Sequence, residues 1–281
     1  MSRTCCVGIV VALGASVPAS AQLITISNPS FEANPAPPNG FPVLIPTGWQ
    51  LHDPSRIIDF GNDAVGVLNP TGSTFFPAGA PLGSNVALVF IAQDVGAGPA
   101  GLRQSLAANL LAERRYSLTV EVGNIASGVG NPPFDFFFDL DGFPGYSVQL
   151  LAGGVVVGED LNTLASEIPE GEFRLSRVVV DVPAGHPMAG TQLQIRLLNV
   201  NIPGTPMEPA IEVDFDDVRL SVGPIPECPG DFDGDSDTDS DDVVLFFGAW
   251  DAGDNPADVD DDGDTDSDDI IVFFAAWDSG C

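Results

Sequence analysis

Residues 146–157 read YSVQLLAGGVVV. Apolar Tyr146, Val148 and Leu150 alternate with polar residues, and a Gly-Gly pair then separates this run from three valines. Successive side chains of a strand point to opposite faces of its sheet, so this alternation is typical of a half-buried strand. The glycine pair indicates a tight turn, and the whole stretch therefore predicts a β-hairpin.

The same alternation recurs along the first four fifths of the chain. It is found in residues 116–122, 193–197 and 213–216, with Gly-, Pro- and Asn-rich segments between the runs. No segment of this part shows the 3.6-residue period of a long helix. Short strands at this spacing predict a mainly β fold, and we expect a jelly-roll β-sandwich over residues 22–222.

Charge divides the chain into two parts. The 281 residues carry 40 Asp+Glu and 9 Lys+Arg, a net charge of -31, which disfavours nucleic acid and anionic membranes as partners. Residues 228–281 alone hold 18 Asp and no basic residue. Because this break follows a Pro- and Gly-rich stretch, we expect a linker over residues 223–227 and a second, small domain over 228–281.

The N-terminus has the pattern of an export signal. Arg3 precedes an apolar run over residues 7–17 and a small-residue cleavage pattern, so residues 1–21 are predicted to be a signal peptide of a secreted protein. The run is shorter than the roughly 20 residues of a transmembrane helix. After cleavage Cys228 and Cys281 remain, and an exported protein favours a disulfide between them over two unrelated thiols.

The acidic domain contains a duplicated loop. Residues 231–242, DFDGDSDTDSDD, align with residues 258–269, DVDDDGDTDSDD, at an offset of 27. Acids at positions 1, 3, 5, 9 and 12, with a carbonyl at position 7, give the spacing of an EF-hand-like calcium loop. The predicted ligands of two calcium ions are Asp231, Asp233, Asp235, Asp237, Asp239 and Asp242 in the first loop and Asp258, Asp260, Asp262, Asp264, Asp266 and Asp269 in the second.

Each loop is followed by an apolar stripe with helical spacing, which argues against the alternative of a solvated acidic tail. The apolar residues fall at i, i+3, i+4 and i+7, so we expect two helices that bury these faces against each other. The stripes are Val243, Phe246, Phe247 and Trp250 in the first repeat and Ile270, Phe273, Phe274 and Trp277 in the second.

From Cys228 to the final Gly-Cys, this duplicated segment resembles the dockerin family. That resemblance implies a calcium-folded domain that binds a cohesin-type protein and attaches the chain to a scaffold or cell surface. Loop positions 10 and 11 contribute to cohesin recognition in that family. Here they are Ser240 and Asp241 in one repeat and Ser267 and Asp268 in the other.

The ends of the long module carry a second resemblance. Residues 28–32, NPSFE, and 213–220, VDFDDVRL, resemble the first and last strands of galactose-binding-like jelly rolls and carbohydrate-binding modules. In that architecture a structural calcium ion commonly joins an opening Glu to a closing Asp. The resemblance implies Glu32 and Asp217 as ligands of a third calcium ion, with Asn28 as a carbonyl donor; alternatively, Asp217 is an exposed strand-end residue.

Over most of its length, the module also resembles the hapalindole-type (Stig) cyclases. The matching stretches are residues 28–32, 66–70, 101–106, 116–124 and 143–154. Members use a carboxylic acid in an aromatic pocket to rearrange and cyclise an indole terpenoid, which implies Asp214 as the acid and a pocket near Tyr146. Alternatively, Asp214 is a polar, outward-facing residue of the last strand.

The functional hypotheses come from different classes. The main one is a secreted, non-catalytic module that binds a glycan or small apolar ligand, acts in polysaccharide catabolism and is displayed by the dockerin. The alternatives are an enzyme, cyclase-like or polysaccharide-active, and a structural surface protein. The chain has only two His and lacks Gly-x-Ser-x-Gly and HExxH motifs. Residues 134–138, FDFFF, predict either an exposed apolar lip for a ligand or a buried strand.

Overall fold

The structure is a computed structural model with two compact units that divide between Pro224 and Ile225, and each unit is described by itself. The predicted signal peptide lies outside the described residues, so export stays a prediction. No helix in the described part of the chain is long and apolar enough to cross a membrane. The described residues are 22–92, 98–132, 135–201, 212–225, 228–232, 238–252, 257–259 and 265–279.

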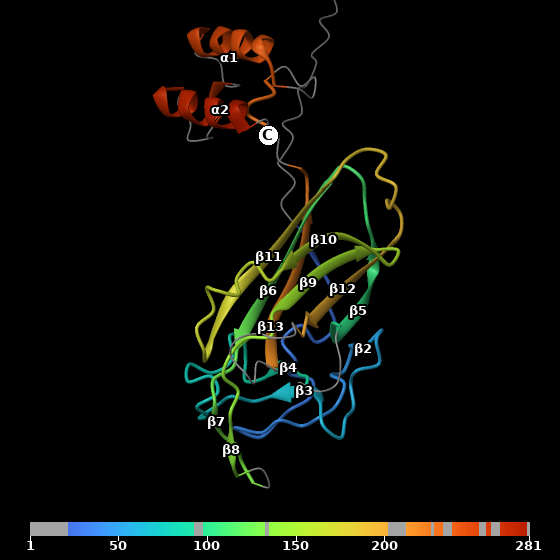
Figure 1. The fold of residues 1–281 in the computed structure, drawn as a ribbon. Coiled ribbons are helices and arrows are strands. Elements are labelled where there is room, and N and C mark those ends of the chain that lie inside the picture. Colours follow the sequence, from blue (N-terminus) through green and yellow to red (C-terminus); the bar gives the residue numbers. More distant parts are fainter. Residues whose placement is uncertain are drawn as a thin grey trace, which may run out of the picture. The chain divides into compact units, whose positions relative to one another are not determined.

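Two antiparallel sheets form the first unit (Figure 1). The six-stranded sheet has the order β11-β6-β13-β4-β3, and β1 also pairs with β13. Its strands are β1 (Gln22–Ile24), β3 (Ala64–Leu68), β4 (Val86–Phe90), β6 (Arg114–Asn124), β11 (Glu172–Val182) and β13 (Glu212–Gly223).

The five-stranded sheet has the order β10-β9-β12-β5-β2. A separate short hairpin pairs β7 (Gly128–Val129) with β8 (Phe137–Phe138). The strands of the five-stranded sheet are β2 (Gln50–His52), β5 (Ala100–Asn109), β9 (Tyr146–Ala152), β10 (Val155–Leu161) and β12 (Gln192–Asn199).

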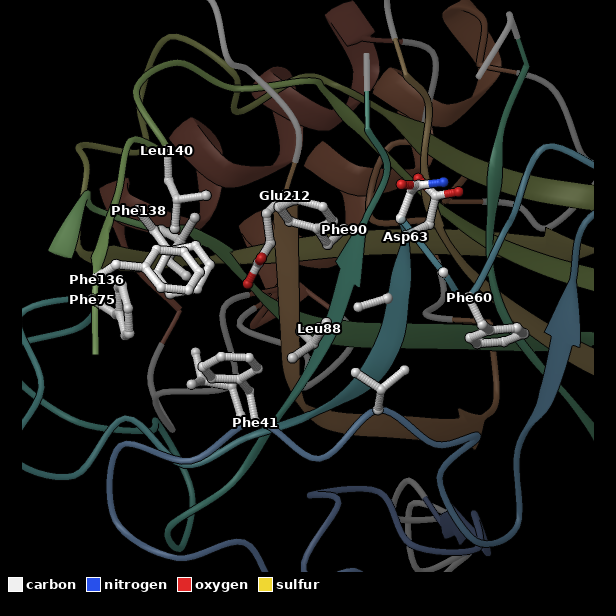
Figure 2. Close-up of a pocket in the computed structure, with 16 residues that line it drawn as sticks. Phe41, Phe60, Asp63, Phe75, Leu88, Phe90, Phe136, Phe138, Leu140 and Glu212 are labelled. Carbon is white, nitrogen blue, oxygen red and sulfur yellow. The ribbon is translucent and has the colours of Figure 1, made fainter. Parts of the chain in front are cut away.

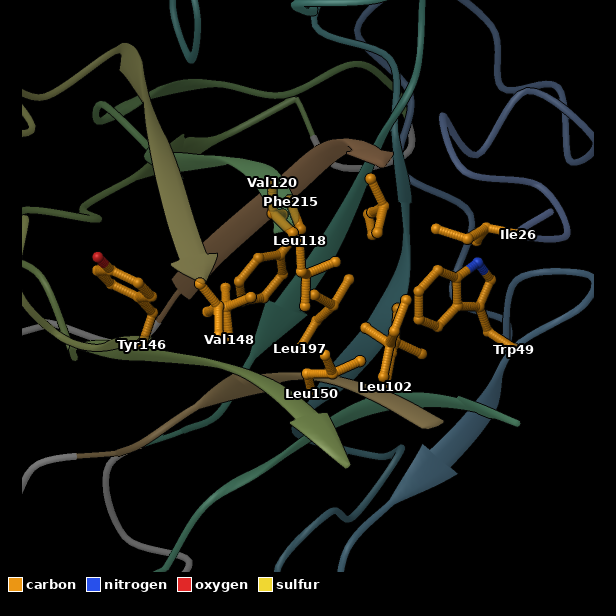
Figure 3. Packing of buried hydrophobic residues seen from close by; sticks show 14 of the residues in the cluster. Ile26, Trp49, Leu102, Leu118, Val120, Tyr146, Val148, Leu150, Leu197 and Phe215 are labelled. Carbon is orange, nitrogen blue, oxygen red and sulfur yellow. The ribbon is translucent and has the colours of Figure 1, made fainter. Parts of the chain in front are cut away.

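The main core lies between these two sheets (Figure 3). Leu118 and Phe215 of the six-stranded sheet and Val148 and Leu197 of the five-stranded sheet all belong to this core cluster and are 0% exposed. Each such side chain contributes about 1.5–3 kcal/mol through burial. The predicted alternation is confirmed in residues 116–122, 146–150 and 193–197, where every second residue faces this core, whereas in β13 it shifts by one residue after Phe215.

The predicted hairpin is also confirmed. Strands β9 and β10 pair from Ala152↔Val155 onward. Gly153 and Gly154 between them have φ values of +56° and +85°, a left-handed conformation that L side chains rarely adopt.

A second apolar cluster covers the outer face of the six-stranded sheet. Leu68 and Leu88 come from its strands, whereas Phe75, Phe76, Ile125 and Leu140 come from the connections around it, with Phe138 of β8 packed against them. The outer face of this antiparallel sheet is therefore buried here, instead of facing water. This covered face holds the candidate site.

The second unit contains the two expected helices, α1 (Ser240–Ala252) and α2 (Ser267–Ser279). Phe246 and Phe273 are fully buried and stacked with ring centroids 4.1 Å apart. The indole N–H of Trp250 donates to the Asp266 carbonyl, and that of Trp277 donates to the Asp239 carbonyl. The two repeats thus contact each other reciprocally through the predicted stripes.

Candidate functional site

A cavity of about 400 Å³ lies at the outer face of the six-stranded sheet (Figure 2). Strands β3, β4, β8 and β13 and the connections between them form its wall. Most of the lining is apolar, and it includes six phenylalanines: Phe41, Phe60, Phe75, Phe90, Phe136 and Phe138.

The aromatic wall is centred on Phe138. Its ring lies 5.7 Å from that of Phe41 in an edge-to-face arrangement, 6.3 Å from Phe75 and 4.5 Å from Phe136, measured between centroids. Such rings offer both faces and edges to an apolar ligand. Both interpretations of the FDFFF stretch hold in part, since Phe136 and Phe137 are 53% and 63% exposed while Phe138 packs against the second cluster. Phe134 lies outside the described residues.

Two carboxyl groups, those of Asp63 and Glu212, line the cavity. The Asp63 carboxylate accepts backbone N–H groups of Ala92 and Asp59 at 2.6 and 2.7 Å, so it fixes the surrounding loops. Glu212 of β13 extends its carboxyl group among the phenylalanines (Figure 2). Burial raises the pKa of Glu212 to about 8.

Asp214, the acid expected from the sequence, lies two residues further along the same face of β13. It is 0% exposed, and neither carboxyl oxygen has a hydrogen-bond partner within the described residues. Burial, followed by the charge of Glu212, raises its pKa well above the ordinary value of 3.8. The alternative of a polar, outward-facing position holds in part: Asp214 lies on the outer face of the six-stranded sheet, opposite Leu88, but this face is covered. Asp214 is absent from the cavity lining, whereas Glu212, which our sequence reasoning missed, forms part of it.

The expectation of a pocket near Tyr146 is also wrong. Tyr146 lies on the five-stranded sheet and packs in the core between the sheets (Figure 3). Its hydroxyl donates to the Asp160 carboxylate at 2.7 Å. Burial, together with hydrogen bonding to Asp160, raises the pKa of Tyr146 to about 12, so this side chain stays a neutral structural donor.

Glu212 and Asp214 form a pair of interacting buried acids. Two carboxylates in one apolar environment cannot both be ionised without a large energetic penalty, so the pair retains a proton at neutral pH. Because burial raises the pKa of Glu212 itself to about 8, Glu212 is protonated at pH 7, and its carboxyl group lines the aromatic cavity. The arrangement can therefore protonate an apolar molecule and stabilise the resulting cation with ring faces and a carboxylate.

A different pair of acids lies near the chain's opening segment. Glu32 accepts the backbone N–H groups of Ser84 and Asn85, both at 2.7 Å, and Asp216 accepts that of Leu82 at 2.7 Å. Burial, partly opposed by this hydrogen bond, raises the pKa of Asp216 to about 8, and the charge of Glu32 adds to the rise. The Asp216 Oδ1 atom is buried with no hydrogen-bond partner in the described part of the chain. An orphaned carboxylate oxygen beside a second carboxylate fits a hard cation.

The structure favours Asp216 over Asp217 as the partner of Glu32. The Asp217 carboxylate forms an ion pair with Arg219, at 2.7 Å between Oδ2 and Nη2. The expected carbonyl donor, Asn28, already accepts the Trp49 indole N–H at 3.1 Å through its backbone oxygen. Residues 28–32 and 213–220 are nevertheless brought together, because the Val218 N–H donates to the Pro29 carbonyl.

The duplicated loops are described only at their ends. Asp242 and Asp269, at loop position 12, are buried and accept the backbone N–H groups of Asp239 and Asp266 at 2.8 Å. Positions 9 and 12 thus meet in both repeats. Among the described residues no group of three or more His, Cys, Asp or Glu is placed to hold a metal ion. The loop ligands that lie outside the described residues are Asp233, Asp235, Asp237, Asp260, Asp262 and Asp264.

The remaining predicted site residues of this unit are the cohesin-binding positions, the first residue of each loop and the two cysteines. Ser240 and Asp241 begin α1, Ser267 and Asp268 begin α2, and all four are exposed. Asp231 and Asp258 are half-buried. Cys228 is disulfide-bonded. Its expected partner, Cys281, lies outside the described residues, so the pairing itself stays a prediction.

Comparison with known proteins concerns the first unit. The family model described as HpiC1 cyclase matches residues 22–221. A solved apo cyclase from Fischerella sp. is 36% identical, with a TM-score of 0.65 over 74% of this chain and 99% of that chain. A Stig cyclase from Fischerella sp. TAU, in complex with (3Z)-3-(1-methyl-2-pyrrolidinylidene)-3H-indole, is also 36% identical, with a TM-score of 0.64 over 74% of this chain and all of that chain.

A further solved structure is that of a cyclase from Fischerella sp. TAU in complex with 4-(1H-indol-3-yl)butan-2-one. It is 36% identical, with a TM-score of 0.64, over 73% of this chain and all of that chain. No curated protein matches the chain. These findings correct the main functional prediction, because they indicate a cyclase and not a carbohydrate-binding module displayed by a dockerin on a cohesin.

Proposed function

Because the chain belongs to the HpiC1-like cyclase family, we propose that its first unit catalyses the acid-promoted cyclisation of a small indole-type substrate. The observation that carries this proposal is Glu212, a buried acid with a pKa of about 8 in the wall of a phenylalanine-lined cavity. General acids work best when their pKa lies near the operating pH. An ordinary exposed Glu would have lost its proton at neutral pH.

The substrate class follows from the lining and from the related structures. Two of the related cyclases are in complex with molecules that contain an indole-type ring and a small substituent. A cavity of about 400 Å³ lined by six phenylalanines suits a planar aromatic molecule of this kind. Few polar groups line the cavity, which favours a largely apolar substrate.

In the proposed mechanism Glu212 donates its proton to the bound substrate, and positive charge develops on the carbon framework. The rings around Phe138 stabilise that charge through their faces, and the new Glu212 carboxylate stabilises it electrostatically. After ring closure the carboxylate takes a proton back from the cyclised cation. Asp214 is a positioning residue: burial and then the charge of Glu212 raise its own pKa, so it adds no negative charge beside the acid at neutral pH.

Binding of an indole probe tests the cavity directly. We expect Phe138→Ala to weaken binding of 4-(1H-indol-3-yl)butan-2-one by about tenfold or more, because truncation removes the ring at the centre of the aromatic wall. Isothermal titration measures this change. Val179→Ala is the matched control, since Val179 is 49% exposed on β11 and is not part of the lining. Equal affinities of the two variants would place the ligand elsewhere.

We also propose calcium as a cofactor of the first unit, held by Glu32 and Asp216. The support is the orphaned Asp216 oxygen beside Glu32 at the junction of residues 28–32 and 213–220. When bound, calcium would supply positive charge that keeps both acids ionised and links the two ends of the module. The duplicated loops of the second unit are a separate calcium proposal, supported by the meeting of loop positions 9 and 12.

Thermal unfolding of the full chain with and without calcium tests the first-unit site. Calcium at a hundred times its Kd should stabilise that unit by about 2.7 kcal/mol. Asp216→Asn should abolish this gain, whereas Asp217→Asn should retain it, because Asp217 is paired with Arg219. A gain that survives Asp216→Asn but is lost in Asp217→Asn would instead support the ligand expected from the sequence.

A further inference from the structure

A row of polar side chains crosses the outer face of the five-stranded sheet. Backbone register places five residues side by side, one from each strand, and their apolar chain neighbours Leu102, Val148, Leu150, Ile195 and Leu197 face the core. The row runs Glu159 (β10), Gln149 (β9), Arg196 (β12), Arg103 (β5) and Gln50 (β2).

Two arginines are direct neighbours in this row. Arg103 and Arg196 are Cα partners across β5 and β12, in a chain with only 9 Lys+Arg against 40 Asp+Glu. Like charges placed directly opposite each other destabilise a sheet. Within the described residues, the ion pairs involve Arg115, Arg174 and Arg219, and neither arginine of this row takes part in one.

The nearby acids are engaged elsewhere. The Glu159 carboxylate accepts the Ser147 hydroxyl and the Gln149 amide at 2.7 and 2.9 Å. The Asp53 carboxylate, next to His52, accepts the backbone N–H groups of Ile57 and Ile58. The positive charge of the row is therefore left without a carboxylate partner in the described part of the chain.

Arg196 also carries an unused donor. Its Nη1 donates to Gln149 at 3.3 Å, but its Nε is buried with no hydrogen-bond partner among the described residues. A buried donor without an acceptor is costly. His52 of β2 lies within electrostatic reach, because burial and then the charges of Arg196 and Arg103 lower its pKa. Two guanidinium groups thus converge on one patch with a donor to spare, and burial together with their charge favours the neutral form of His52.

We propose that Arg103 and Arg196 form a binding site for a phosphate group on the outer face of the five-stranded sheet. Two guanidinium groups match the two negative charges of a phosphate dianion and offer it planar, paired donors. Gln50 flanks the pair in the same row and supplies a further amide donor. The cavity at Glu212 lies on the other sheet, so this site is independent of the proposed cyclisation.

Isothermal titration of the full chain with inorganic phosphate at low ionic strength tests this proposal. We expect one site, with affinity reduced about tenfold or more in Arg103→Gln and in Arg196→Gln, because each removes charge-assisted hydrogen bonds. Arg177→Gln is the matched control, since Arg177 is an exposed arginine of β11 outside the three ion pairs. It should bind phosphate as the unmodified chain does. If phenyl phosphate binds more tightly than inorganic phosphate, the ligand of this site is a phosphate ester.

Thermal midpoints give an independent readout that a purely structural role would not produce. Without phosphate, Arg103→Gln should unfold at the same or a higher temperature than the unmodified chain, because it relieves the like-charge contact. With phosphate, the midpoint should shift upward in the unmodified chain and in Arg177→Gln, and by much less in Arg103→Gln. No phosphate binding, or equal binding by Arg103→Gln and Arg177→Gln, would overturn the proposal.

Discussion

Glu212→Gln should lower the cyclisation rate by about a hundredfold or more, the usual contribution of a general acid. Glutamine preserves the shape of the side chain but has no acidic proton to donate to a carbon framework. The variant should remain folded, because a neutral amide replaces a carboxyl group that is itself neutral at pH 7. Product formation from an indole substrate, measured with equal amounts of folded protein, checks this expectation.

Two further variants distinguish the loss of the catalytic acid from a non-specific loss of activity. Glu167→Gln alters an exposed Glu outside the cavity and should leave the rate unchanged. Asp214→Asn should largely retain the rate and its pH profile, because burial raises the pKa of Glu212 and the neighbouring Asp214 is itself uncharged at neutral pH. Activity retained in Glu212→Gln would assign the acid to another group and would refute the proposed mechanism.

The stability of the first unit should fall as the pH rises from about 5 to 8. Above the ordinary Glu pKa of 4.5 the unfolded chain releases the Glu212 proton, but the folded chain retains it until about pH 8. Folding therefore takes up a proton in this window, and the free energy of unfolding decreases with rising pH. One such group contributes at most about 1.4 kcal/mol per pH unit.

Urea unfolding of the unmodified chain and of Glu212→Gln, at several pH values in this window, isolates the contribution of Glu212. Glutamine does not titrate, so the variant should lose less stability than the unmodified chain as the pH rises. Asp216 also has a pKa of about 8, and its contribution largely cancels in the comparison. Parallel stability curves for the two proteins would show that Glu212 titrates normally.

Strand positions could be predicted because alternation is a local property of the sequence. Tyr146, Val148 and Leu150 face the core as expected, and the Gly153-Gly154 turn joins the expected strands. The helices of the second unit could be predicted because the same apolar stripe with helical spacing follows each of the two duplicated loops. Both patterns depend on residues that are close together in the chain.

The site could be predicted only in part, because it depends on long-range packing. Alternation places Glu212, Asp214 and Asp216 on one face of β13, but no local signal tells that loops and the β7-β8 hairpin cover that face. Because these segments cover that face of the sheet, the three acids on it are buried. The alternation also does not predict the register shift between Asp216 and Arg219, where Asp217 has φ 45° and its carboxylate pairs with Arg219.

The proposed mechanism depends on the proton of Glu212, and a carbon-13 NMR titration of the labelled glutamate carboxyl groups tests for this proton most directly. The Glu212 signal is identified by its loss in Glu212→Gln. We predict that this signal titrates with a midpoint near pH 8. A midpoint near the ordinary value of 4.5 would mean that Glu212 is ionised at neutral pH, which would contradict its role as the acid.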